Sequence, residues 1–467
     1  MTVDAAILST DHVAALIEAG LACHRAGRID DAHAPDFANA HNNLGNALME
    51  LGDLAGAAQR YRRARSLEPQ SAHFVFNLGR AREANGERDA ALAEFRIAAA
   101  LDPRDLRTLI HMGRLLRSME KHGEAAACFE AVVAREPDNV LALFELGYAY
   151  DAMHRYEEAI PLYRRAAELK PDGAAIINNL AFALTALARY DEAEIDYRRA
   201  LELNPDLPES RFQLGMLMLR REGYTGGWPL FENRKLTTTA RANYRKLPCA
   251  EWRGEPLEGK PFLICREQGV GDQIQFVRYA GLLAQMGAQV HAWVAPELAS
   301  LAATVPGVAR VLDAAPSDEA IASEYDYWCD TKSLPLKFPG RPIDSSTPYM
   351  RADTVQVAAW RARVNALSGA AHRRIGLVWA GNPRHHFDAF RSVPLKSLLP
   401  LSAPTGNAWF AIQKGPGAAQ LAPIAGRWPT DAPGDWKPRF PIRPAKVSGR
   451  RAARISPHRR PGVRPPA

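Results

Sequence analysis

The chain has 467 residues, of which 47% are hydrophobic and 24% are charged. That length suits about three domains of ~150 residues, and the composition is typical of a folded body rather than a disordered chain. No stretch approaches the ~18 uninterrupted apolar residues of a membrane span. The first residues also lack a basic segment followed by an apolar core, so we expect no membrane span and a cytoplasmic protein.

The net charge of +7 is concentrated at one end of the chain. Residues 426–467 contain nine Arg, two Lys and two Asp, which leaves the remainder slightly acidic. A nucleic-acid-binding face needs basic side chains clustered on the folded body, so we expect no nucleic-acid partner for that body. The five cysteines lie far apart without a CxxC pair, so we predict no zinc or other metal site and no disulfide framework.

A 34-residue period organises the first half of the sequence. Four series of residues keep this step in phase: Gly45, Gly79, Gly113 and Gly147; Ala57, Ala91, Ala125, Ala159 and Ala193; Tyr61, Phe95, Phe129, Tyr163 and Tyr197; Pro69, Pro103, Pro137, Pro171 and Pro205. The period and the residue types resemble the tetratricopeptide repeat, a helix–turn–helix unit. Repeats of this kind stack into a superhelix in which each unit contacts its neighbours.

The repeat array is predicted over residues 13–222. Its full repeats are 38–71, 72–105, 106–139, 140–173 and 174–207. An incomplete repeat is expected to begin near Val13. After Pro208 we expect one more helix of the kind that opens each repeat. Proline fits the start of each connection, because no helical N–H is needed there.

The concave face of such an array binds extended peptides or helices, so we expect a protein or peptide partner. The sixth repeat position holds Asn43, Asn77 and Asn179. Two interpretations stay open: the amides form a ladder that hydrogen-bonds a peptide backbone, or asparagine is simply common at this position. His111 and Glu145 interrupt the series, and Glu145 disfavours an acidic partner.

After a linker or capping segment at 223–260, the pattern becomes strand, glycine turn, helix. The run PFLIC precedes EQGVGDQ, a helical pattern and a second apolar run, AQVHAWV. This βαβ order predicts a parallel sheet. RRIGLVWAGNP and NAWFAIQKG open a second unit. The predicted fold is therefore an α-superhelix followed by Rossmann-like α/β domains at 261–370 and 371–425, the second incomplete.

The glycine turn EQGVGD is the main chemical candidate. Gly269 and Gly271, after Gln268, allow the backbone to approach a ligand closely, and the next helix offers N–H groups to an anion. Ile274 replaces the third glycine of a dinucleotide fingerprint, which disfavours NAD and FAD. Asp272 is either the N-cap of this helix or a general base in a cleft.

The segments EQGVGDQIQFVRYA, YDYWCDTKSLPL, RIGLVWAGNPRHHFDAFRSVPL and WFAIQKG resemble bacterial tetratricopeptide proteins with a glycosyltransferase-like domain. That domain is similar to the heptosyltransferases, whose two Rossmann-like domains form the GT-B architecture. The resemblance implies inverting, metal-independent transfer from a nucleotide-sugar to an acceptor bound by the repeats, with no further cofactor. It implies Asp272 as the base, and as ligand-binding residues Gln268, Gly269, Gly271, Asn382, Arg391 and Lys414.

The sequence departs from this family near its end. Residues 426–467 contain nine Pro and nine Arg without helical or strand periodicity, a composition that cannot bury a core. We therefore predict an unstructured tail, which reflects either a truncation or frame change or a true basic tail for an anionic partner. Sugar transfer is expected to be impaired, and the alternative function is a non-catalytic scaffold that acts through the repeats.

Overall fold

The computed structural model describes residues 35–424 apart from 222, 239–243, 245, 268, 340–347, 370–372, 384–387 and 403–405. The chain divides into two compact units, residues 1–246 with 338–340 and residues 247–337 with 341–467. The incomplete repeat expected from Val13 and the tail at 426–467 lie outside the described residues.

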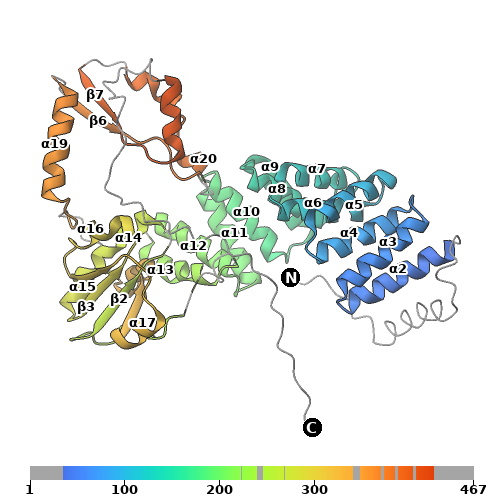
Figure 1. Ribbon diagram of the computed structural model, residues 1–467, viewed down its shortest axis with the longest axis horizontal. Coiled ribbons are helices and arrows are strands. Elements are labelled where there is room, and N and C mark those ends of the chain that lie inside the picture. Colours follow the sequence, from blue (N-terminus) through green and yellow to red (C-terminus); the bar gives the residue numbers. More distant parts are fainter. Residues whose placement is uncertain are drawn as a thin grey trace, which may run out of the picture. The chain divides into compact units, whose positions relative to one another are not determined.

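The first unit is a stack of paired α-helices (Figure 1). The pairs are α2 (Pro35–Glu50) and α3 (Leu54–Leu67), α4 (Ala72–Ala84) and α5 (Arg88–Leu101), α6 (Leu106–Ser118) and α7 (His122–Val133), α8 (Val140–Ala152) and α9 (Tyr156–Leu169), α10 (Ala174–Ala186) and α11 (Tyr190–Leu203), and α12 (Pro208–Arg220) and α13 (Tyr224–Phe231). The predicted tetratricopeptide superhelix is confirmed.

The periodic glycines explain how closely the two helices of a repeat approach. A Cβ atom placed on Gly79 or Gly113 would lie 2.7 Å from the ring of Phe95 or Phe129 in the second helix of the same repeat. Both rings are fully buried. Glycine leaves room for the aromatic ring in these repeats, so the two series repeat with one period; Ala181 holds the same position in the fifth repeat, where Tyr197 is also fully buried.

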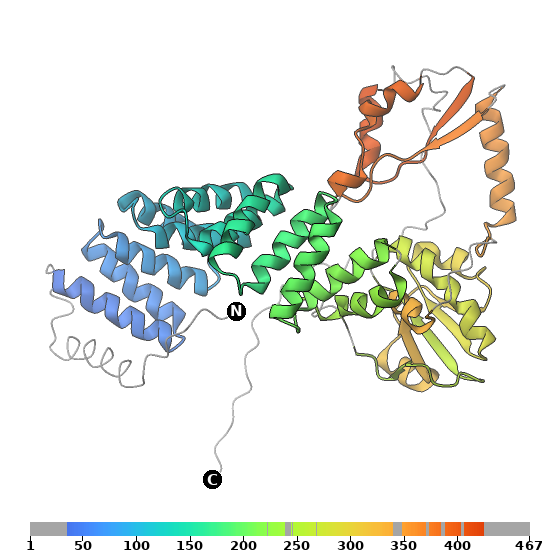
Figure 2. The same ribbon diagram turned by 180° about the vertical axis from the view of Figure 1, so that it is seen from behind.

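The first helices of neighbouring repeats also contact one another. Such contacts join α2 to α4, α6 to α8, α8 to α10 and α10 to α12, and the rings of Phe76 on α4 and His111 on α6 lie 5.2 Å apart. The first helices therefore line the inner face of the superhelix, and the second helices form its outer face. Figure 2 shows the same stack from behind.

The second unit contains a parallel five-stranded sheet with the strand order β1-β5-β2-β3-β4. Its strands are β1 (Ala250–Glu251), β2 (Pro261–Cys265), β3 (Gln289–Trp293), β4 (Val308–Leu312) and β5 (Tyr327–Asp330). The predicted parallel sheet is confirmed. Strand β1 lies inside the segment expected to be a linker, and β4 has no counterpart among the predicted strands.

Both faces of the sheet are covered, as in other parallel sheets. Leu263 and Cys265 of β2 pack with Ile321 of α17 (Asp318–Glu324). Phe262 and Ile264 alternate with them and are equally buried. The remaining helices of this region are α14 (Val270–Phe276), α15 (Ala280–Gln285), α16 (Ala299–Ala302) and α18 (Leu334–Lys337).

The last described segment begins with α19 (Thr354–Ser368) and contains a second, smaller sheet. Strands β6 (Arg373–Leu377) and β7 (Asn407–Ala411) are parallel, and α20 (Asp388–Arg391) lies between them in the chain. A buried cluster joins Trp379, Leu395, Trp409 and Ile424. The GT-B arrangement of two Rossmann-like domains stays a prediction. No helix in the described part of the chain is long and apolar enough to cross a membrane.

Candidate functional site

The glycine turn lies at the point where the strand order of the large sheet reverses. From β2 the chain continues to β3 and β4 on one side, and then returns to β5 on the other side of β2. In open α/β sheets, ligands bind outside the carboxyl ends of the strands at such a point. Glu267 follows β2 and Lys332 follows β5, so both lie at this edge.

The turn has a conformation that favours glycine. Gly269 has φ = 95°, and a Cβ atom on it would lie 2.7 Å from Oδ2 of Asp272. Gly269 occupies the N-cap position of α14, whereas Asp272 lies in the first helical turn. A Cβ atom on Gly271 would meet nothing within 4 Å, so the backbone there is open. Gln268 lies outside the described residues.

Lys332 links two carboxylates at this edge. Its Nζ lies 3.5 Å from Oδ2 of Asp272 and 4.0 Å from Oε1 of Glu267, and its backbone N–H donates to Oε2 of Glu267 at 2.9 Å. The Glu267 side chain is buried, whereas 44% of the Asp272 side chain is exposed. The lysine therefore holds Asp272 in place while leaving part of its carboxylate accessible.

Buried hydrogen bonds fix the turn to its neighbours. Oε1 of Gln273 accepts from the backbone N–H of Ala295 at 2.8 Å, and Nε2 donates to the carbonyl of Glu267 at 3.1 Å. The hydroxyl of Thr331 donates to the carbonyl of Cys265 at 2.5 Å. The ends of β2, β3 and β5 are thus tied together around Asp272.

Glu267 and Lys332 lie inside motifs that the sequence singles out, yet the sequence alone assigns neither a role. The available signal was their position: Glu267 comes two residues after the predicted strand PFLIC, and Lys332 lies in the segment YDYWCDTKSLPL, two residues after β5. The carboxyl ends of parallel strands share one edge. What the sequence lacked was the strand order, which makes β2 and β5 neighbours.

Asn382, Arg391 and Lys414 gather at one end of the β6–β7 pair. Oε1 of the buried Gln413 accepts from the backbone N–H of Ala380 at 2.9 Å, so the segments that follow β6 and β7 lie side by side. The backbone N–H of Gly381 donates to Oγ of Ser392 at 2.8 Å, which joins the neighbourhoods of Asn382 and Arg391. All three residues are exposed.

The asparagines on the inner face differ in what they contact. Nδ2 of Asn77 donates to Oδ1 of Asn42 at 2.8 Å, and only 4% of Asn77 is exposed. Its amide therefore serves packing between two repeats. Oδ1 of Asn179 accepts from Nδ2 of Asn178 at 3.2 Å, and Asn43 and Asn179 are half-buried. For Asn43 and Asn179, hydrogen bonding to the backbone of a bound peptide stays a prediction.

Glu145 on α8 is held by two arginines of α6. Nε of Arg114 donates to Oε1 at 3.1 Å and Nη1 of Arg117 to Oε2 at 2.7 Å. The Glu145 side chain is 4% exposed, against about a third for each arginine. Arg117 also lies over the ring of Tyr148, 5.0 Å from its centroid, and 40% of that tyrosine is exposed.

His111 lies beside these groups, and its Nδ1 is 4.0 Å from Oε2 of Glu83. Burial lowers its pKa to about 4, with further lowering by Arg80 and Arg114, so the imidazole is neutral at pH 7. Arg107 lies 5.9 Å from the centroid of Phe76, the ring that also packs on His111. The inner face of α4 and α6 thus presents arginines around a neutral histidine.

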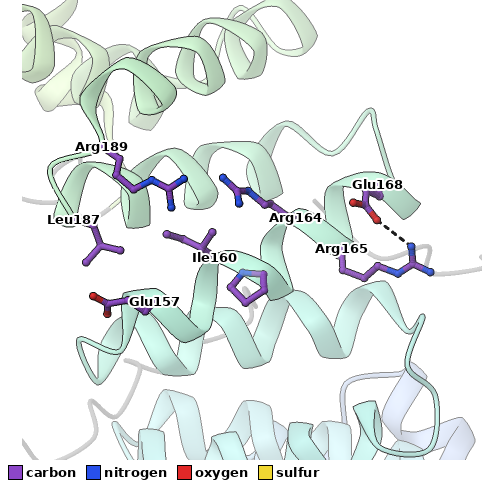
Figure 3. Close-up of a pocket in the computed structure, with 8 residues that line it drawn as sticks. Glu157, Ile160, Arg164, Arg165, Glu168, Leu187 and Arg189 are labelled. Carbon is purple, nitrogen blue, oxygen red and sulfur yellow. Dashed lines mark hydrogen bonds and ion pairs between the residues drawn. The ribbon is translucent and has the colours of Figure 1, made fainter.

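A hollow of about 430 Å³ lies on the other side of the array, against α9 and the start of α11. Figure 3 shows Arg164 and Arg189 pointing toward one another across it. Both pair with Glu192, at 3.0 and 2.7 Å, and Arg165 pairs with Glu168 at 3.0 Å. Because these charges are neutralised within the array, the hollow offers little to a ligand.

Comparison with known proteins supports the repeats. Models of the tetratricopeptide repeat family match residues 42–105, 111–174 and 174–207. Protein FlbA from Caulobacter vibrioides is 29% identical over 181 residues, which cover 35% of this chain and 30% of FlbA. The chain thus spans about a third of the length of that curated relative.

Several solved structures resemble the array. MamA (from residue 41) of Desulfovibrio magneticus RS-1 is 22% identical, with a TM-score of 0.36, and covers 38% of this chain and 99% of its own. YrrB, described as a TPR protein with an unusual peptide-binding site, is 18% identical, with a TM-score of 0.35 and coverage of 37% and 89%. Pseudomonas aeruginosa PilF is 20% identical, with a TM-score of 0.38 and coverage of 44% and 97%.

Proposed function

We propose that this chain is a protein-binding scaffold that holds a segment of a partner against the inner face of α4, α6 and α8. The tetratricopeptide array supplies the general basis, because stacked repeats form extended concave binding surfaces. The observation that carries the proposal is the exposure of the Tyr148 side chain. The periodic aromatic residues such as Phe129 and Tyr163 are fully buried, whereas Tyr148 is 40% exposed beneath Arg117.

An exposed tyrosine paired with an arginine is typical of the anchor residues of protein interfaces. Here the pair bridges the first helices of two neighbouring repeats, since Arg117 belongs to α6 and Tyr148 to α8. The contact with Arg117 already orients the ring within the array itself, so little conformational entropy would be lost on binding. We therefore place the centre of the interface at this pair.

The proposal is tested with peptides selected from a random library against the full chain. Their affinities are then measured for the unmodified chain, for Tyr148→Asp, and for Ile195→Asp as a matched control. Ile195 is 67% exposed on the outer helix α11. We expect Tyr148→Asp to weaken binding ~10-fold or more and Ile195→Asp to leave it unchanged. Equal effects of both substitutions, or the absence of any selected peptide, would contradict the proposal.

The α/β unit supports a second candidate function, sugar transfer from a nucleotide-sugar with Asp272 as the base. The observation in its favour is that Asp272, half-exposed, lies at the switch point of the sheet, where ligands of α/β folds bind. A base must come within hydrogen-bond reach of the acceptor hydroxyl. The exposed Asn382, Arg391 and Lys414 would contact the donor diphosphate.

For this chain we expect turnover near background. The residues that we assign to the donor are Asn382, Arg391 and Lys414, and weak positioning of the donor forfeits up to ~7–11 kcal/mol of rate acceleration. Nucleotide-sugar consumption is measured for the unmodified chain and for Asp272→Asn, and the two are expected to be equal. Turnover that Asp272→Asn abolishes would instead establish sugar transfer as an activity of the chain.

A further inference from the structure

A line of hydrogen-bonded side chains crosses three successive helix pairs, from α12 to α8. The hydroxyl of Ser210 on α12 donates to Oδ1 of Asn178 at 2.8 Å, and Nδ2 of Asn178 donates to Oδ1 of Asn179 at 3.2 Å. Asn179 is hydrogen-bonded in turn to the hydroxyl of Tyr163. Because this hydroxyl donates to Oδ2 of Asp151 at 2.8 Å, it accepts from the amide of Asn179. These five residues form a relay in which every donor points towards Asp151.

Asp151 ends the relay in buried surroundings without a cation. Only 6% of the residue is exposed, and its Oδ1 has no hydrogen-bond partner among the described residues. Burial raises its pKa to about 7, against the hydrogen bond from Tyr163, and no charged side chain in the described part of the chain contributes to that shift. A buried carboxylate without a cation is costly to ionise, so its charge changes near neutral pH.

The titratable groups that face Asp151 from neighbouring helices are tyrosines. They are Tyr156 and Tyr163 on α9 and Tyr197 on α11. Burial raises the pKa of each tyrosine, and the charge of Asp151 raises it further. All three therefore stay protonated at neutral pH. Nδ1 of His154 lies 3.0 Å from the hydroxyl of Tyr156, so the test below includes a variant of this histidine.

The relay adjoins the proposed binding surface at two residues. Asn179 is half-buried at the sixth repeat position, on the first helix of its repeat. The proposed anchor Tyr148 lies three residues before Asp151 and hence on the same side of α8. After burial and Asp151, Tyr148 also raises the pKa of Tyr163. A change at Asp151 therefore occurs within a few side chains of this surface.

Protonation of Asp151 reverses the relay. Since Oδ1 has no partner in the described part of the chain, the acid proton lies on Oδ2 and donates to the oxygen of Tyr163. The hydrogen of Tyr163 then needs another acceptor, and Oδ1 of Asn179 provides one when the amide turns over. That turn exchanges the positions of the amide donor and acceptor of Asn179 at the inner face.

We infer that Asp151 is a proton-operated switch of the proposed binding surface: its charge sets the direction of the relay and, with it, the hydrogen-bonding groups that Asn179 presents to a bound segment. This inference rests on the proposed scaffold function. Coupling between two sites is reciprocal. A segment that prefers one direction of the relay therefore also changes the affinity of Asp151 for its proton.

The test uses twelve-residue peptides with blocked ends and without Asp, Glu, His or Cys, so that their own charge stays constant. They are selected against the full chain at pH 8.5, where Asp151 is ionised, and their affinities are measured by calorimetry at pH 8.5 and pH 5.5. The affinity should fall ~10-fold at pH 5.5, which corresponds to a shift of about one unit in the pKa of Asp151. A peptide selected at pH 5.5 should show the opposite dependence.

Substitutions that keep the shape of the side chain locate the switch. Asp151→Asn removes the charge and Tyr163→Phe removes the hydroxyl, so each should abolish most of the pH dependence. Asp172→Asn, at an exposed turn position, and His154→Gln are the controls and should keep it. Thermal unfolding shows whether each variant is folded. Carbon NMR of the Asp151 carboxyl group gives a second readout, because a peptide selected at pH 8.5 should lower its titration midpoint.

An affinity that is equal at the two pH values, or an equal change in Asp151→Asn and the unmodified chain, would overturn the inference. So would a pH dependence that His154→Gln removes and Asp151→Asn retains, since the histidine would then be the switch. Each of these results would leave the scaffold function standing as long as binding depends on Tyr148. If no peptide depends on Tyr148, the scaffold proposal itself fails.

Discussion

At the scale of single residues, the surroundings of each glycine decide whether it stabilises or destabilises the repeat array. Glycine at the eighth repeat position faces an aromatic ring, whereas Gly123 of the same repeat as Gly113 has open space around it. Gly113 faces the ring of Phe129. Gly123 on α7 is exposed, and a Cβ atom on it would meet only Sδ of Met153, at 3.9 Å. The two glycines of one repeat should therefore respond oppositely to the same substitution.

Gly113→Ala should destabilise the chain by ~1–3 kcal/mol, because the new methyl group would lie 2.7 Å from the buried ring of Phe129 and force it to shift. Gly123→Ala should stabilise it by ~0.5–1 kcal/mol, since alanine is the better helix former and meets no obstacle. Urea unfolding followed by circular dichroism measures both changes. Two changes of the same sign would show that the glycine–aromatic contact does not limit the packing.

Asp151 on α8 makes the stability of the array depend on pH. Burial raises its pKa to about 7, although the hydroxyl of Tyr163 donates to Oδ2 at 2.8 Å. An aspartate in the unfolded chain titrates near ~4. Between these two values the folded chain keeps a proton that the unfolded chain has released, so the free energy of unfolding falls as the pH rises from about 4 to about 7.

Asp151→Asn should remove this decline, because the amide stays neutral and can still accept from Tyr163. At pH 8 the variant should be more stable than the unmodified chain by ~2–4 kcal/mol, and near pH 4 the two should be alike. Urea unfolding at a series of pH values measures the difference. Asp172→Asn, at an exposed turn position, is the control. A pH profile of Asp151→Asn that runs parallel to that of the unmodified chain would contradict the account.

At the scale of elements, the strands with the strongest apolar runs were the ones that the sequence predicted. PFLIC and AQVHAWV form β2 and β3, whose side chains are buried on both faces of β2 and on alternate positions of β3. Strand β4 was missed although four of its five residues are apolar; none of them is fully buried in the structure. The two-residue β1 is too short for any periodicity.

A single glutamine organises the small β6–β7 sheet. Oε1 of Gln413 accepts from the backbone N–H groups of Trp379 and Ala380, both at 2.9 Å. Gln413→Leu leaves these donors without an acceptor and should cost ~2–4 kcal/mol of local stability. Hydrogen exchange of residues 373–424 should quicken, whereas Gln356→Leu, at an exposed position of α19, should have no effect. Unchanged exchange in Gln413→Leu would show that other contacts hold this sheet together.

At the scale of the whole molecule, the sequence predicted the repeat array well because its determining contacts are local and periodic. Gly79 and Phe95 lie in one repeat, and their partners recur every 34 residues. The candidate sites depend on contacts between distant segments, which carry no such period. Lys332 and Asp272 meet only because β5 lies beside β2, and Glu145 is neutralised by arginines of the preceding repeat.

The measurement that tests the central claim most directly is hydrogen exchange of the full chain with and without a selected peptide. If the inner face is the binding surface, exchange should slow in α4, α6 and α8 and stay unchanged in the outer helices α5, α7 and α9. Protection confined to the outer helices, or to the turn between β2 and α14, would contradict the account.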